Sequence, residues 1–207
     1  MYVPKHFRAD DAETAAFLQE VRAADLITPT SSGLYATFLP LIHQPATGRF
    51  GSLLGHVARK NDHWRLETVG ESLVIAHGPD AYISPGWYES KREHGRVVPT
   101  WNYVTANIYG ELVIHDDVAW LERLVRALTD RHEADRAEPW SVDDAPRTYT
   151  DSQLQAIVGI ELRISRLEVK VKLGQNRSAA DIDGLIEGLR ATGDEAVAAA
   201  TGRARRH

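Results

Sequence analysis

The sequence contains no cysteine, and this absence removes several kinds of chemistry. Without thiols there is no disulfide framework, no thiolate metal site and no cysteine nucleophile. The sequence also lacks any apolar run near the roughly 18 residues that indicate a membrane-spanning helix. Its N-terminus, residues 1–8, has no apolar signal-peptide core. We therefore expect a cytoplasmic protein with no membrane partner.

An excess of positive charge is missing too. Lys and Arg number 24 against 29 Asp and Glu, which gives a formal net charge of −5 at pH 7. Sequence-independent DNA binding depends on many Lys and Arg contacts to phosphate, so this charge balance argues against that class of protein. The cationic run at residues 203–206 is too short to read a DNA sequence by itself.

Several familiar motifs are absent as well. The sequence has no Gly-x-Gly-x-x-Gly, no P-loop and no Gly-x-Ser-x-Gly pattern. Among the nine histidines, His56 and His63 lie seven residues apart without an acidic partner at metal-ligand spacing, so we predict no metal site. A phosphate-bearing ligand must therefore be held by some other arrangement.

What the sequence does contain is a succession of strand patterns. A chain of 207 residues with 43% hydrophobic and 26% charged residues is long enough for a sizeable globular core. We expect six or seven strands, at residues 26–28, 34–42, 52–58, 71–77, 81–88, 97–114 and 160–171. Helices are expected at residues 10–21, 116–132, 152–158 and 178–190. Because the strands mostly follow one another directly, the pattern predicts an antiparallel, mainly β barrel with peripheral helices.

The remaining segments are expected to be irregular. We predict a loop at residues 44–49, a turn at 78–80, a mobile loop at 91–95 and a polar linker at 139–149. The whole chain, residues 1–207, is expected to be a single domain. Its C-terminal helical segment is expected to cover residues 178–200. The helical structure is expected to fray from Ala191 onward, and the tail at residues 201–207 belongs to this frayed end.

Two adjacent cations, Arg59 and Lys60, mark the first candidate site. They follow the apolar segment 52–58 and precede Asn61, which suits a turn or a helix start. A strand that ends in this way offers a point charge, a planar guanidinium fork and free backbone N–H groups, which together suit a phosphate. The alternative is a solvated pair of surface charges.

Two further polar groups are candidates. Thr100, Trp101 and Asn102 begin the longest strand and can offer a flat ring a stacking surface and hydrogen bonds, although most barrel aromatics are core residues. Lys172, Gln175, Arg177 and Ser178 lie between a strand and a helix. They are either donors for an anionic or amide-rich ligand, or simply a loop in which the serine is the N-cap of the next helix.

Taken together, these segments resemble the PaiB family, described as FMN-binding negative transcriptional regulators with a split-barrel flavin fold. The resemblance is carried, in chain order, by residues 1–7, 55–61, 81–88, 98–103, 157–161 and 170–178. It implies an FMN-binding split β-barrel of six strands that forms a homodimer. In the wider flavin split-barrel group FMN lies in grooves between two subunits.

The resemblance also implies a set of site residues. In the wider group a Ser-Arg-Lys type segment holds the phosphate, and residues 58–60 resemble it with Ala58 in place of the hydroxyl residue. Phe38 and Gly174 replace the family's common His and Ser. The expected cofactor-binding residues are Thr37, Phe38, His56, Val57, Ala58, Arg59, Lys60, Thr100, Trp101, Asn102, Lys172, Gln175 and Arg177.

Each group has an expected role. Arg59 and Lys60 neutralise the phosphate, while Thr37 and the backbone of residues 56–58 line the ring. Residues 100–102 contact the ring or close the pocket. Lys172, Gln175 and Arg177 reach in from the partner subunit.

Three functions stay open at this point. The first is an FMN-binding negative transcriptional regulator that acts through its ligand, through a regulatory partner or on DNA. The second is a flavin-dependent oxidoreductase that acts on a small molecule with NAD(P)H. The third is a dimer that has lost the cofactor, which the departures at Phe38 and Ala58 allow. Whether the protein is an enzyme is not decided by the sequence.

Overall fold

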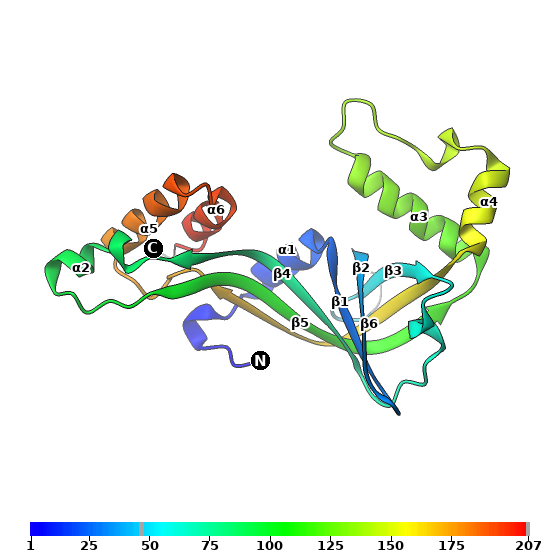
Figure 1. Ribbon diagram of the computed structural model, residues 1–207, viewed down its shortest axis with the longest axis horizontal. Helices are drawn as coiled ribbons and strands as arrows, with labels where there is room; N and C mark the ends of the chain where they lie inside the picture. Colours follow the sequence, from blue (N-terminus) through cyan, green and yellow to red (C-terminus); the bar gives the residue numbers. More distant parts are fainter. Residues whose placement is uncertain (46–47, 206–207) are drawn as a thin grey trace. The chain divides into compact units, whose positions relative to one another are not determined.

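The computed structural model describes residues 1–45 and 48–205, and its six strands form a closed barrel in the order β1-β2-β3-β6-β5-β4 (Figure 1). The strands are β1 (Ala23–Thr30), β2 (Gly33–Gln44), β3 (Ser52–Ala58), β4 (Ser72–Ile83), β5 (Thr100–His115) and β6 (Ile157–Lys172). Strand β1 pairs antiparallel with β2 and β4, and β3 pairs antiparallel with β2 and β6. The predicted mainly β, antiparallel barrel is confirmed.

Helices flank the strands, also as predicted. The α-helices are α1 (Asp11–Glu20), α2 (Glu89–Glu93), α3 (Val118–Glu133), α4 (Arg147–Gln155), α5 (Ala179–Ala191) and α6 (Glu195–Arg203). Single 3-10 turns are η1 (Lys5–Phe7), η2 (Asp62–Arg65), η3 (Pro85–Trp87) and η4 (Val142–Asp144). The side chains of Asp117 and Ser178 cap α3 and α5 by accepting backbone N–H groups. No helix in the described ranges is both long and apolar enough to cross a membrane.

The chain divides into two compact units, which we name by their content. The barrel unit comprises Leu18–Ala76 and Asn107–Leu167, and the terminal unit comprises Met1–Phe17, His77–Ala106 and Glu168–His207. The boundaries fall within α1, β4, β5 and β6. The expectation of a single domain stays a prediction.

The core of the barrel unit follows from strand alternation. In β1 every second residue is buried, starting at Ala24, which is the pattern of a strand with one face toward a barrel interior. Other strand residues of the barrel unit that are at most 2% exposed include Leu39, Leu41, Leu53, Val74, Ile108, Ile160 and Leu162. On the outside, Leu124 and Leu128 of α3 pack against Leu54 of β3, so that one face of this amphipathic helix is buried.

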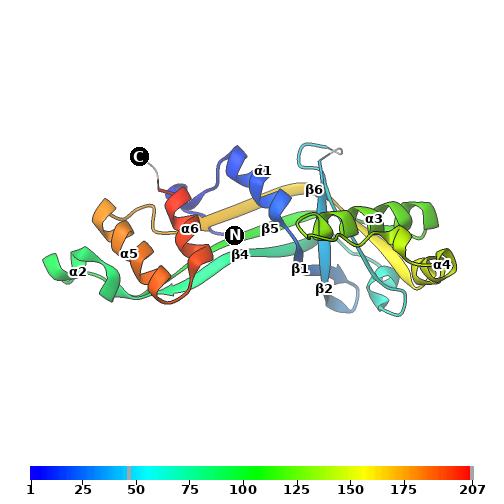
Figure 2. The same cartoon turned by 90° about the horizontal axis from the view of Figure 1, so that it is seen from above.

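The terminal unit has its own core, in which α5 and α6 lie side by side (Figure 2). Leu185, Leu189 and Val197 of these helices pack with Ile83 and Tyr88. Gly188 permits a close approach of Trp87, because a Cβ there would lie 2.3 Å from the indole ring. Replacing this glycine would therefore push the helix away from the aromatic side chain.

Three of the predicted irregular segments are in fact ordered elements. The turn predicted at residues 78–80 lies inside β4. Gly78 leaves room for Val104 there, because a Cβ at position 78 would lie only 2.9 Å from the Val104 side chain. The predicted mobile loop at 91–95 overlaps α2. The frayed C-terminal segment is wrong as well, because α6 buries Val197 and Ala198 against the terminal-unit core. Residues 46–47 of the predicted loop and 206–207 of the predicted tail lie outside the described ranges.

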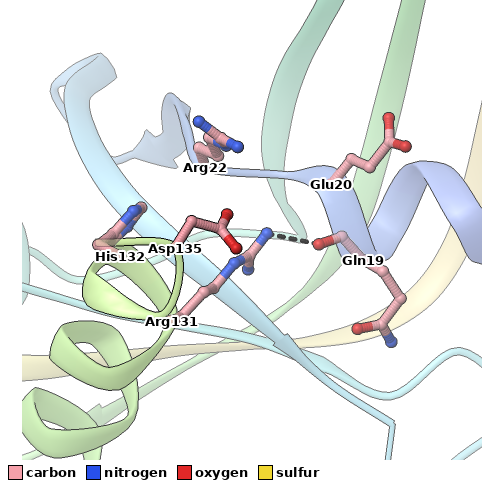
Figure 3. A pocket seen from close by; sticks show the side chains of 6 residues that line it. All are labelled: Gln19, Glu20, Arg22, Arg131, His132 and Asp135. Atoms are coloured by element: carbon pink, nitrogen blue, oxygen red, sulfur yellow. Dashed lines mark hydrogen bonds between the residues drawn. The ribbon is translucent and has the colours of Figure 1, made fainter. Parts of the chain in front are cut away.

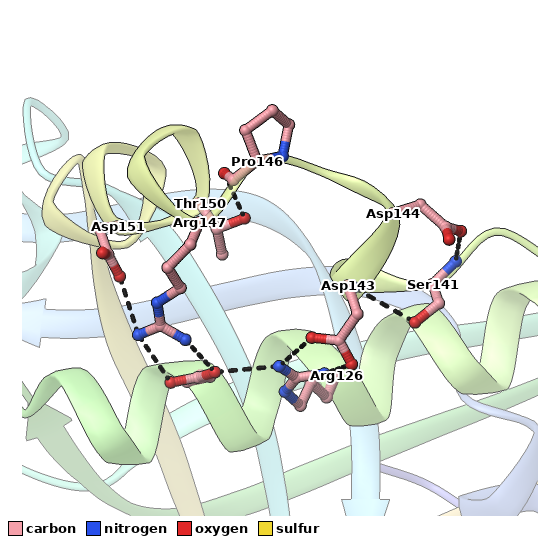
Figure 4. A network of polar contacts seen from close by, with 9 residues as sticks. Arg126, Ser141, Asp143, Asp144, Pro146, Arg147, Thr150 and Asp151 are labelled. Carbon is pink, nitrogen blue, oxygen red and sulfur yellow. Dashed lines mark hydrogen bonds and ion pairs between the residues drawn. The ribbon is translucent and has the colours of Figure 1, made fainter.

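The predicted polar linker at 139–149 contains η4 and the start of α4, and ion pairs attach it to α3 (Figure 4). Glu122 of α3 accepts hydrogen bonds from Arg126 at 3.1 Å and from Arg147 at 2.8 Å. Arg126 also binds both carboxylate oxygens of Asp143. Each exposed pair contributes little alone, but several shared charges together hold the segment. The polar composition was therefore wrongly interpreted as that of a linker.

Candidate functional site

The first candidate group lies at the turn that follows β3. The strand ends at Ala58, and the backbone N–H of Arg59 donates to the carbonyl of Ala156 at 2.8 Å. The N–H of Asn61 donates to the carbonyl of Ala58 at the same distance. Two of the backbone donors that we expected to be free for a ligand are therefore used within the fold.

The Arg59 side chain is also largely occupied. Its two terminal nitrogens donate to the two carboxylate oxygens of Asp116, its Nε donates to the carbonyl of Gln155 at 2.7 Å, and Nη2 also reaches the carbonyl of Ile157 at 3.0 Å. A guanidinium has five N–H donors, so one is left for a ligand. The hydrogen-bonded partner raises the pKa of Arg59 and lowers the pKa of Asp116. Arg59 thus joins the turn to Asp116, which follows β5, to the end of α4 and to the start of β6.

Lys60, the next residue, is in the opposite situation. Its side chain is exposed, and no described residue forms an ion pair or hydrogen bond with its ammonium group. The turn around it is braced by Trp64, whose indole N–H donates to the carbonyl of Arg59 at 3.1 Å. Lys60 is therefore the available cation of this turn, and Arg59 is a fixed support beside it.

The predicted ring-lining residues of the barrel unit differ in exposure. Phe38 is 70% exposed and Ala58 is also on the surface, whereas Val57 is buried in the core. His56 is half-buried, and burial lowers its pKa. The hydroxyl of Thr37 accepts a hydrogen bond from the side-chain amide of Asn61 at 3.3 Å. Thr37 is thus linked directly to the turn that carries Lys60.

Sequence reasoning missed His63, which lies under this turn and is 1% exposed. Its Nδ1 lies 2.8 Å from the Thr37 hydroxyl and its Nε2 lies 2.8 Å from the Thr28 hydroxyl. The Thr28 hydroxyl in turn contacts that of Ser72 at 2.8 Å. Burial lowers the pKa of His63, which favours the neutral ring. The sequence signal for it is a histidine close to the two cations.

The second candidate group lies in the terminal unit, where β5 begins and β6 ends. The ammonium group of Lys172 donates to the Thr100 hydroxyl at 2.6 Å and to the carbonyl of Trp101 at 2.5 Å. Trp101 is 50% exposed, and its indole N–H donates to Asp80 at 3.2 Å. The structure therefore brings together two segments that the sequence separates by about seventy residues.

Positive charge gathers around Lys172. Burial is the main cause of its lowered pKa, and the charges of Lys170 and Arg177 lower it further. The Tyr103 ring lies 5.3 Å from the ammonium of Lys170 and 5.7 Å from that of Lys172. No carboxylate among the described residues pairs with Lys172, so an anion is the missing partner that this cluster would favour.

Asn102 supplies the sharpest indication of a ligand in this group. It is 2% exposed, and its Nδ2 atom has no hydrogen-bond partner among the described residues. A buried donor without a hydrogen-bond partner destabilises the folded state by about 1–3 kcal/mol, so this amide lowers the stability of the protein unless a ligand accepts its hydrogen bond. Gln175, by contrast, uses its amide to accept from the N–H of Leu173 at 2.9 Å and to donate to the carbonyl of Val171 at 2.7 Å. It closes the loop after β6.

Comparison with known proteins gives the class and then the family. Two solved structures share this barrel: the conserved hypothetical protein Rv2991 from Mycobacterium tuberculosis and the flavocytochrome Anf3 from Azotobacter vinelandii. The first has a TM-score of 0.56 and 14% identity, covering 83% of this chain and 90% of its own. The second has a TM-score of 0.56 and 13% identity, covering 83% and 72%. At these identities the likeness shows the fold alone, that of the split barrels.

The family follows from closer relatives. The "Putative FMN-binding domain" family matches residues 1–166. The chain is 34% identical over 191 residues to the protease synthase and sporulation protein PAI 2 of Bacillus subtilis (strain 168), covering 91% of this chain and 89% of that protein. It is 30% identical over 158 residues to the uncharacterized protein YKL070W of Saccharomyces cerevisiae, covering 67% and 94%. The chain belongs to the FMN-binding family of PaiB type.

FMN is thus the cofactor of this family and of this chain, and the described residues fit it. FMN supplies a redox-active ring with carbonyl acceptors and a phosphate dianion. Lys60 and Lys172 are cations without a carboxylate partner in the described ranges, and Asn102 has a buried amide donor without an acceptor. Each unit thus offers groups of the kind that FMN needs: Lys60 of the barrel unit would suit the phosphate, and Lys172 and Asn102 of the terminal unit would suit an anion and a ring acceptor. No three acidic or histidine side chains of the described residues gather closely enough for a metal ion.

Proposed function

We propose that this protein is an FMN-binding negative transcriptional regulator of the PaiB type, and that it works as a homodimer in the cytoplasm. The observation that carries the ligand part is the unpaired buried amide of Asn102 in the segment that contacts Lys172. The name of the Bacillus subtilis relative, a sporulation protein, supports a regulatory role. The homodimer rests on the family resemblance.

The proposal assigns different roles to the two cations of the β3 turn. Lys60 is exposed and unpaired in the described ranges, so it neutralises the FMN phosphate. Arg59 spends four of its five N–H donors on Asp116 and on backbone carbonyls, so it positions the turn. Lys172 and Asn102 are the terminal-unit residues that contact the cofactor, and Arg177 adds positive charge near Lys172.

The regulatory step is proposed to act through the ligand or a protein partner. Helix-based DNA readout places a basic, exposed helix in the major groove. Helix α5 carries three acidic residues and one arginine, and α3 carries arginines that are paired in part with its own acids. No described helix has the strongly basic face that direct readout needs.

Titration of the purified protein with FMN, followed by flavin fluorescence, tests the ligand part. We expect saturable binding, with riboflavin bound more weakly because it lacks the phosphate. Absence of saturation at high micromolar protein would contradict cofactor binding. Light scattering after size exclusion tests the homodimer.

A gel shift with the gene's own promoter DNA, with and without FMN and with cell extract as a source of partner, tests the regulatory part. A promoter complex that FMN strengthens or weakens supports the proposal. Bleaching of bound flavin by NAD(P)H with turnover of a small substrate, together with no promoter complex under any condition, would instead support the oxidoreductase.

A further inference from the structure

The barrel unit carries a polar hollow at the C-terminal end of α3, and none of its lining residues is assigned to FMN above (Figure 3). Its volume is about 490 Å³. The lining residues are Gln19, Glu20, Arg22, Arg131, His132 and Asp135. This volume lies within the roughly 300–1,000 Å³ of small-molecule sites, but the lining is charged where most such sites are apolar. A charged or strongly polar ligand is the kind that such walls recognise.

Two guanidinium groups in this hollow lack anionic partners within residues 1–45 and 48–205. Arg131 is half-buried, and its one hydrogen bond in the described structure is a donation to the backbone carbonyl of Gln19 (Figure 3). Four of its five N–H donors therefore remain without an acceptor among the described residues. Arg22 forms no ion pair with any described residue. Unused donors on two adjacent cations are the arrangement that binds an anion.

The electrostatics separate Arg131 from other arginines of the barrel unit. The pKa values of Arg59, Arg126 and Arg147 are raised by hydrogen-bonded carboxylates. The pKa of Arg131 is instead lowered, first by burial and then by the charge of Arg22. Neither Glu20 nor Asp135 compensates it, although both line the same hollow.

The hollow is lined by carboxylates as well as arginines, and the carboxylates indicate which groups the rest of the ligand carries. Carboxylates such as Glu20 and Asp135 accept hydrogen bonds, so they suit hydroxyl groups. The hollow is also much larger than a single phosphate group, which leaves room for a body attached to the anion.

We propose that this hollow binds the phosphate group of a small, hydroxyl-bearing metabolite, with Arg22 and Arg131 on the phosphate and Glu20 and Asp135 facing the hydroxyl groups. The site shares no lining residue with the β3 turn and does not depend on the regulatory proposal. FMN itself carries a phosphate and hydroxyl groups, so the test must distinguish a second ligand from the cofactor.

Isothermal titration of the full-length protein with glycerol 3-phosphate, inorganic phosphate and glycerol tests the site at constant ionic strength, because salt screens exposed charges. We expect glycerol 3-phosphate to bind more tightly than phosphate, and glycerol to give no signal. Arg131→Gln should weaken glycerol 3-phosphate binding by about tenfold, because a charge-assisted fork is lost. Arg131→Lys should lose less, since the charge remains without the fork.

Arg123→Gln is the matched control, because Arg123 is exposed on the same helix and outside the hollow. It should change the affinity by less than about twofold, as expected for a distant exposed charge. Thermal melting without ligand checks that each variant folds. Absence of binding at about ten millimolar ligand would overturn the proposal, because that concentration is above the usual range of about 1 μM to 1 mM for KM values of metabolites. So would an equal loss in Arg123→Gln.

FMN titrations of the same variants separate the two sites. Arg131→Gln should bind FMN like the wild type, and Lys60→Met should bind glycerol 3-phosphate like the wild type. If Arg131→Gln loses FMN and glycerol 3-phosphate to the same extent, the hollow belongs to the cofactor and the second ligand is wrong. If FMN does not bind the wild type while glycerol 3-phosphate does, the family-based proposal fails and this one stands.

Discussion

Arg59 and Lys172 are both cations near the end of a barrel strand, yet their surroundings are opposite. Arg59 is held by a carboxylate and two backbone carbonyls that take up most of its donors. Lys172 contacts a hydroxyl and one carbonyl, and its nearest charges are positive. A cation in a motif is available to a ligand only where the fold leaves its charge uncompensated. That condition holds at Lys172 and not at Arg59.

The largest effect is expected from Lys172→Met, which removes the uncompensated cation. FMN affinity should fall by about ten- to a hundredfold, because a charge-assisted contact in a partly buried site is lost. Flavin fluorescence titration measures the change. Lys91→Met, which removes an exposed lysine of α2, is the control and should leave the affinity unchanged. Equal losses in both variants would mean that only the net charge of the terminal unit matters.

The next effect separates the two cations of the β3 turn. Lys60→Met should weaken FMN by about tenfold and leave riboflavin unchanged, since the contact is with the phosphate. Asp116→Asn should strengthen FMN by about threefold, because it releases donors of Arg59 toward a ligand. Both values come from parallel titrations with FMN and riboflavin.

Arg59→Lys provides the opposing test. It keeps the positive charge but loses the planar fork, so we expect a lower midpoint of urea unfolding and only a small change in FMN affinity. A loss of FMN affinity as large as that of Lys60→Met, with unchanged unfolding, would show that Arg59 contacts the phosphate directly.

Asn102→Leu should lower the affinity for FMN and raise the free energy of unfolding. Leucine has nearly the same shape and no unpaired donor, so the free energy of unfolding of the cofactor-free protein should rise by about 1 kcal/mol. FMN affinity should fall several-fold, about what one neutral hydrogen bond contributes. Urea denaturation and fluorescence titration measure the two changes. A variant that is less stable than the wild type would indicate that the amide has a partner within the fold.

The smallest effect is a pH dependence set by Lys172. Its folded-state pKa lies below the ordinary value of about 10.4, so between the two values the unfolded chain binds more protons than the folded one. The free energy of unfolding contributed by this group therefore rises as pH increases through the folded pKa. FMN affinity should decline over the same range, because the ammonium charge is lost. Lys172→Met should flatten both profiles in denaturation and titration series.

Much of the fold could be predicted from local patterns. Alternating apolar residues in residues 160–171 and the helical spacing after Asp117 correctly predicted β6 and α3, because burial on one face imposes those periods on any chain. The errors fell where tertiary contacts override composition. Gly78 reads as a turn residue but lies inside β4 beside Val104, and the Ala-rich end forms α6 because a core is present to receive it.

The candidate site was predictable only as a set of residues. That Arg59 and Lys60 are cations beside a strand end, and that Thr100, Asn102 and Lys172 are polar groups beside strands, follows from the sequence. Their relation to FMN came from the family resemblance. His63 went unnoticed because its role depends on two hydroxyl groups, of Thr28 and Thr37, that the barrel brings to its ring.

By itself, then, the sequence determined the mainly β class, most of the element order and the identity of the cationic groups, because periodicity and residue chemistry are local properties. Only the tertiary structure decided which charges are compensated. Asp116 lies 57 positions from Arg59 in the chain and neutralises it in space, while no carboxylate of the described residues reaches Lys172. The interaction of two charges depends on their separation and on the medium between them, and the fold sets both.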